Sequence, residues 1–114
     1  MNSKHLELMI IIAKRGLANK IVAAISEYAT FPSIIMSRGT ASNEILAALG
    51  IGEPEKDMIF CFTEFSNVQN IYKILEIDFS FTEKKLGIAM TVPVSAVGGN
   101  LTLQILLGKT KDLM

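Results

Sequence analysis

The sequence predicts an α+β fold in which a four-stranded antiparallel sheet carries two helices on one face, a ferredoxin-like βαββαβ sandwich. Two observations predict it. Short apolar runs of strand length alternate with segments of helical periodicity, in the order strand, helix, strand, short helix, strand, helix, strand. The two halves also echo each other, since the apolar stripe of residues 18–25 matches that of residues 68–75. A doubled unit of strand, helix and strand is typical of this fold.

The first half of the chain supplies two strands and one long helix. Residues 5–14 are rich in Leu and Ile and predict a strand. Over residues 17–29 the apolar side chains recur on one stripe, which predicts an amphipathic helix. Pro32 ends this helix, because the residue before a proline is pushed out of helical backbone. Residues 33–37 then form the second strand.

A short extra helix is expected between the halves. Residues 38–41 form a turn, and Ser42 is placed to cap a helix over residues 43–49. Gly50 stands where a left-handed C-cap belongs. Residues 51–55 are a loop.

The second half repeats the pattern. Residues 57–63 predict the third strand, and Ser66 with Gln69 forms a capping box for the second long helix. A polar loop over residues 79–85 leads into the fourth strand, residues 86–94.

A single domain over residues 1–114 is expected, because no linker or low-complexity segment interrupts the chain. Residues 101–107 fit either a short helix, which we slightly favour, or a fifth strand.

Composition excludes several classes of protein. Half of the 114 residues are hydrophobic, which excludes a disordered chain, and 11 Lys and Arg balance 11 Asp and Glu. The zero net charge argues against nucleic acid as a partner, because phosphate neutralisation needs an excess of Lys and Arg. The apolar run 8–13 is too short to cross a membrane and lacks the flanks of a secretory signal. With a single cysteine, a cytoplasmic location is expected.

The strands are apolar on both faces. In the first strand, Leu8, Ile10 and Ile12 alternate with Met9 and Ile11. The helices of a ferredoxin-like fold cover one face only, and a solvated second face would carry polar residues at alternate positions. We therefore expect an obligate homo-oligomer that packs sheet to sheet.

Catalytic residues are scarce, so we expect neither an enzyme nor a metal site. His5 is the only histidine and stands near the N-terminus, where a solvated or edge position is the ordinary interpretation. Cys61 lies within an apolar run without a neighbouring base, which is typical of a small buried hydrophobe. Glu53, Glu55 and Asp57 are interpreted as a solvated acidic loop.

Two segments are candidates for ligand binding. Residues 37–42 combine a glycine turn, hydroxyls and a helix start, which suit an anion, although capping and turn geometry alone also explain them. Residues 82–87 form a polar loop with two adjacent lysines, for which a solvated turn is the alternative. In this fold the loops after the second strand and before the fourth can lie near each other at one edge of the sheet. A subunit contact could then close a pocket between them.

Four features make the chain resemble the P-II superfamily of nitrogen-regulatory signalling proteins, over about residues 5–99. The first strand enters its helix as Ile-Ile-Ala-Lys-Arg-Gly-Leu, and Arg38-Gly39 stands where the family has Lys-Gly before its long regulatory loop. The split β-α-β order is the third feature. The fourth is residues 87–94, which resemble the family's Gly-Lys-Ile-Phe-Val segment. Residues 38–50 resemble a P-II-like branch in which a short helix replaces the regulatory loop.

The resemblance implies a homotrimer whose sheets line a central core. It implies that ATP, ADP, AMP or another anionic effector is sensed in clefts between subunits, with no cofactor required. A partner protein such as a transporter or metabolic enzyme receives the signal. By position, the ligand cleft would contain Ile11, Arg38, Gly39, Thr40, Lys84, Lys85 and Gly87. Within helix 43–49, the side chains that would meet the partner, or would pack on the trimer, are Ile45, Leu46 and Leu49.

The chain also departs from the family pattern. Residues 81–87 replace the phosphate-gripping Gly-Asp-Gly-Lys loop, and the Arg-x-Arg that follows the fourth strand is missing. The modifiable tyrosine has no counterpart, because the long loop is shortened into residues 41–55. These departures leave a second function open, a structural or assembly trimer that binds no nucleotide and whose clefts are filled by helix 43–49.

Overall fold

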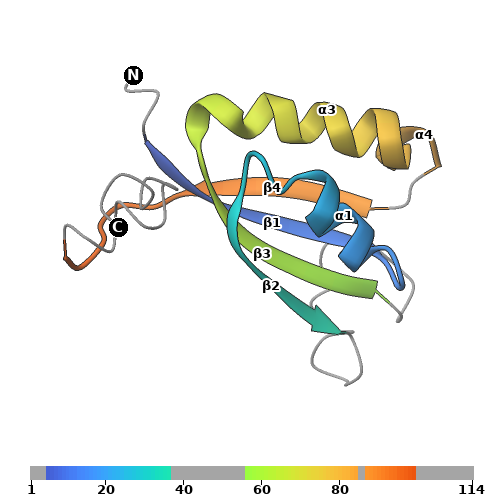
Figure 1. Cartoon of the computed structure of the whole chain (residues 1–114), viewed down its shortest axis with the longest axis horizontal. Coiled ribbons are helices and arrows are strands. Elements are labelled where there is room, and N and C mark those ends of the chain that lie inside the picture. Colours follow the sequence, from blue (N-terminus) through green and yellow to red (C-terminus); the bar gives the residue numbers. More distant parts are fainter. Residues whose placement is uncertain (1–4, 37–55, 85–86, 100–114) are drawn as a thin grey trace.

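The four strands form one antiparallel sheet in the spatial order β2-β3-β1-β4. The computed structural model describes residues 5–36, 56–84 and 87–99. Its elements are β1 (Leu6–Lys14), α1 (Ala18–Ala24), β2 (Thr30–Met36), β3 (Lys56–Glu64), the 3₁₀ turn η1 (Phe65–Asn67), α3 (Val68–Phe79), α4 (Phe81–Lys84) and β4 (Gly87–Pro93). Figure 1 shows α1, α3 and α4 together on one face of the sheet. The predicted ferredoxin-like α+β fold is therefore confirmed.

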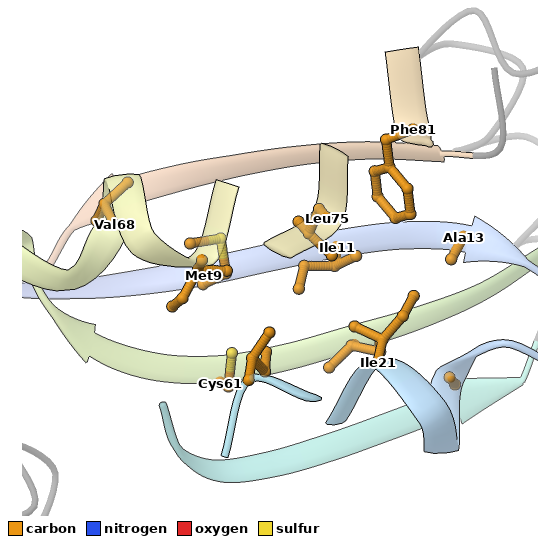
Figure 2. Packing of buried hydrophobic residues seen from close by; sticks show 12 residues of the cluster. Met9, Ile11, Ala13, Ile21, Cys61, Val68, Leu75 and Phe81 are labelled. Carbon is orange, nitrogen blue, oxygen red and sulfur yellow. The ribbon is translucent and has the colours of Figure 1, made fainter. Parts of the chain in front are cut away.

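The helix-covered face of the sheet holds the core. Strand alternation turns Met9, Ile11 and Ala13 of β1 toward the helices, beside Ile59 and Cys61 of the paired strand β3. All five are fully buried. Figure 2 shows how the helices close over them. The buried side chains that the helices contribute are Ala18, Ile21 and Ile25 from α1 and its end, Val68, Ile71 and Leu75 from α3, and Phe81 from α4.

The opposite face of the sheet is apolar as well. In register across three strands, Leu8, Ile10 and Ile12 of β1 lie between two flanking rows. These rows are Phe62, Phe60 and Met58 of β3, and Val92, Met90 and Ile88 of β4. All of these side chains except Ile12 keep part of their surface exposed, Val92 as much as 47%. None of the described helices covers this face, as Figure 1 shows.

The first helix is shorter than the predicted span 17–29, and the second strand starts earlier than residue 33. After α1 the chain turns, with the Ser26 hydroxyl donating to the carbonyl of Ala23 at 3.0 Å. Such local side-chain bonds compete with helix continuation. Thr30 already pairs with Phe62 of β3, so β2 includes the Phe31-Pro32 step. A proline is tolerated there because β2 is an edge strand.

The start of α3 also differs from the expected capping box. A 3₁₀ turn precedes the helix, and Ser66 donates its hydroxyl to the Glu64 carboxylate at 3.4 Å. Asn67 takes the N-cap position without a side-chain cap bond.

The polar loop expected over residues 79–85 contains a further helical turn. Ser80 caps α3 in the left-handed conformation, and α4 begins at Phe81, whose side chain is buried. Burial of that one aromatic residue explains why the segment folds back onto the sheet. The predicted helix 43–49 and the segment 101–107 lie outside the described residues.

Gly87 provides a test of this packing. A Cβ atom on Gly87 would overlap the carbonyl oxygen of Ile12 and would lie 2.9 Å from the ring of Phe81. We expect Gly87→Ala to lower the free energy of unfolding by about 1–3 kcal/mol, because overpacking forces the strand or the ring to shift. Urea denaturation measures the change.

Gly98→Ala is the matched control, because a Cβ atom there meets nothing within 4 Å. It should change stability by about 0.5 kcal/mol or less. Equal stability of the two variants would contradict the close approach of β1, β4 and α4.

Candidate functional site

The end of β2, which precedes residues 37–42, and the start of β4, which follows residues 82–86, lie at the same end of the sheet. Met36 at the end of β2 pairs with Asp57, Asp57 pairs with Ala13, and Ala13 pairs with Gly87 at the start of β4. This row crosses the sheet from one edge to the other. Three strand spacings separate β2 from β4, about 14 Å. Within one chain, β3 and β1 lie between the two strands, and the loop residues 37–42 of the predicted common edge lie outside the described residues.

Three of the predicted ligand residues are described by the structure. Ile11 is fully buried in the core, so it has no surface with which to line a cleft of this chain. Lys84 is exposed in α4, and Gly87 begins β4. The predicted residues that lie outside the described part of the chain are Arg38, Gly39, Thr40 and Lys85 at the ligand cleft, and Ile45, Leu46 and Leu49 at the partner surface.

A carboxylate on α3 holds the α4 turn in place. The Thr82 hydroxyl donates to Glu76 Oε2 at 2.6 Å, and the Thr82 backbone N–H lies 3.3 Å from each carboxylate oxygen. The backbone N–H of Lys84 in turn donates to the Ser80 carbonyl at 2.9 Å. These hydrogen bonds fix the backbone position of Lys84. The six-residue separation of Glu76 and Thr82 matches no common helix signal, so the sequence did not predict this contact.

A pocket of about 320 Å³ opens between α3, α4 and β4. Its floor is Gly87 and Ala89 on the helix-facing side of β4. The Phe81 ring packs close to Gly87, and the small side chain of Ala89 leaves room that a larger one would fill. The other lining residues are Tyr72, Leu75 and Glu76 of α3, Phe81 and Thr82 of α4, and Ile88 of β4. In the sequence, small and large residues alternate along β4, and this pattern could have indicated the pocket.

Asp57 lies at the same end of the sheet, and it is not part of a solvated loop as predicted. Its side chain is buried at the first paired positions of β3. Oδ2 accepts a hydrogen bond from the backbone N–H of Gly16 at 3.2 Å, which ties the turn between β1 and α1 to β3. Oδ1 has no hydrogen-bond partner among the described residues.

The fold of this chain is similar to that of a protein of known structure. No protein-family model and no curated protein matches the chain. Among solved structures, a Thermus thermophilus protein provisionally described as a PII-like signaling protein does match. The match covers 82% of this chain and 90% of that one, with a TM-score of 0.56 and 18% sequence identity.

The chain has a PII-like fold. The agreement extends over most of both chains, so it includes the sheet and not merely one helix pair. It confirms the fold that the resemblance of residues 5–99 implied. No described helix of this PII-like fold is long and apolar enough to cross a membrane.

The reactive side chains of the PII-like core are engaged in packing or pairing. His5 Nε2 lies 3.2 Å from the carboxylate of Glu7, whose side chain is only 4% exposed. Burial raises the pKa of the Cys61 thiol to about 11. Among the described residues, no three His, Cys, Asp or Glu side chains are grouped to hold a metal ion.

Cys61 yields a direct test of core accessibility. Because its side chain is fully buried and its pKa is raised, almost no thiolate is present at pH 8. We expect iodoacetamide to label the native protein at least 100-fold more slowly than the protein in guanidinium chloride. Mass spectrometry counts the adducts. Equal labelling rates would contradict the placement of Cys61 between β3 and the helices.

Proposed function

We propose that this chain is a P-II-like regulatory protein without catalytic activity. It assembles as a homotrimer, senses a small anionic effector such as an adenine nucleotide in clefts between subunits, and regulates a partner protein such as a transporter or metabolic enzyme. The observation that carries the proposal is the uncovered apolar face of a sheet with a PII-like fold.

The assembly follows from the composition of that face. Phe60 and Phe62 lie beside Ile10 and Leu8, with Met90 on the far side, and every one of them keeps exposed surface. Contiguous apolar patches of this kind mark interaction surfaces on soluble proteins. Copies of the same sheet are the simplest partner. In a symmetric oligomer, the apolar face of one copy packs against the apolar faces of the others.

The separation of the sheet edges supports a cleft between subunits. Within one chain, two strands lie between the end of β2 and the start of β4. The segments that follow Met36 and precede Gly87 therefore meet most readily across a contact between neighbouring copies. Lys84 is exposed at the end of α4, and in this proposal it offers a positive charge to the anionic ligand.

The assembly is tested by a charge placed on the apolar face. Phe60→Lys puts an ammonium group on β3 in the apolar face, beside Ile10 of β1. We expect it to convert the oligomer to a monomer, because burying an unpaired charge costs several kcal/mol. Light scattering coupled to size exclusion gives the mass.

Ile77→Lys is the matched control, since Ile77 is 76% exposed on α3 and lies on the helix side. It should leave the mass unchanged. A Phe60→Lys protein that keeps the wild-type mass would contradict assembly through this face.

The effector is tested by thermal shift with ATP, ADP, AMP, cyclic nucleotides and bicarbonate. A ligand that binds the native state raises Tm by mass action. We expect one of these anions to raise Tm, and Lys84→Ala or Lys85→Ala to weaken its affinity about tenfold, since hydrogen bonds to charged groups are worth about 1.5–3 kcal/mol.

Lys73→Ala is the control, because Lys73 is exposed on α3 away from that end of the sheet. If no anion changes Tm while the protein remains oligomeric, the alternative function holds, an assembly trimer without a nucleotide ligand.

A further inference from the structure

The pocket between α3, α4 and β4 has a stable frame. Leu75 and Phe81 line it and belong at the same time to the buried core. Figure 2 shows both side chains directed at the sheet from α3 and α4. A Cβ atom on Gly87 would meet the Ile12 carbonyl of β1 and the Phe81 ring, so Gly87, β1 and α4 are closely packed at the floor of the pocket. A volume of about 320 Å³ is at the small end of the range for ligand sites.

One charged side chain lines this pocket among the described residues, and it is negative. Glu76 stands at the rim, one helical turn after Tyr72. Thr82 occupies part of its hydrogen-bonding capacity, with the strong bond on Oε2 and only a 3.3 Å backbone contact on Oε1. A carboxylate offers about four lone-pair sites, so capacity remains for further N–H donors.

The walls suit a flat or compact organic group. Tyr72 and Phe81 are aromatic, and Leu75 and Ala89 are aliphatic, whereas the side chain of Ile88 lies on the other face of the sheet. An aromatic face next to a carboxylate favours an organic cation, because the ring attracts positive charge and the carboxylate accepts its N–H groups. An anion would meet the Glu76 charge, and none of the described lining residues is a cation that offsets it.

We propose that this pocket binds a small organic cation of the amidinium or guanidinium class, with Glu76 as the recognising group. This site differs in charge from the anionic effector site of the proposed function, and Lys84 does not line it. Either site can therefore exist without the other.

Three ligands of nearly the same shape separate charge from size. Benzamidinium, benzamide and benzoate are titrated into the full-length ¹⁵N-labelled protein and followed by amide chemical shifts. We expect benzamidinium to bind saturably with a Kd of about 0.1–1 mM, as ligand efficiency for nine heavy atoms allows. It should shift the amide signals of Thr82 and Ala89. Benzamide should bind at least tenfold more weakly, and benzoate should not bind.

Two variants test the pocket independently of each other. Glu76→Gln keeps the shape and removes the charge, so benzamidinium should bind at least tenfold more weakly. Ala89→Val fills the floor and should abolish binding without changing any charge. Lys20→Gln is the control and should leave the Kd unchanged, since Lys20 is exposed on α1 and does not line the pocket. The ¹⁵N spectra verify that each variant is folded.

Three results would overturn the inference. The first is binding of benzoate as tight as that of benzamidinium, and the second is an affinity that Glu76→Gln leaves unchanged. The third is a set of shifted signals that lies away from α3, α4 and β4. None of these results affects the nucleotide response, which is read from Lys84→Ala and Lys85→Ala in the thermal-shift experiment.

Discussion

The helices cover one face of a sheet whose two faces are both apolar, and most of the molecule's properties depend on that imbalance. On the covered side, α1 and α3 bury the side chains around Ile11 and Ile59 completely. On the other side, three apolar residues from each of β3, β1 and β4 stand in register without a described element above them. Complete burial of one such side chain is worth about 1.5–3 kcal/mol. The whole face therefore contributes substantially to stability once another surface covers it.

The proposed effector clefts rest on the same imbalance. Because β2 and β4 are the two edges of the sheet, the end of β2 and the start of β4 are separated in a single chain. In the proposed homotrimer, copies that cover the apolar face bring edges of different chains together, and the effector clefts lie between them. The pocket under α3 has another origin. It arises within one chain, because the side chain of Ala89 is too small to fill the space between β4 and the helices. The two proposals thus give one molecule two sites of opposite charge preference.

The sequence predicted the architecture well because its signals are periodic. Alternating apolar residues located the strands to within a few residues, and the stripe at Val68, Ile71 and Leu75 located α3. What the sequence could not predict depends on contacts between distant residues. The bond from Thr82 to Glu76, the burial of Asp57 against Gly16 and the early start of β2 at Thr30 all arise from tertiary packing. The polar loop predicted over residues 79–85 does keep Thr82, Glu83 and Lys84 exposed, but the burial of Phe81 within it also depends on tertiary packing.

Native mass spectrometry of the wild-type protein tests the central claim most directly. Coverage of the apolar face by copies predicts one dominant species at three times the 12.5 kDa chain mass, which persists on dilution to low micromolar concentration. A dominant species at the mass of a single chain would contradict it, because the face would then have to remain in water.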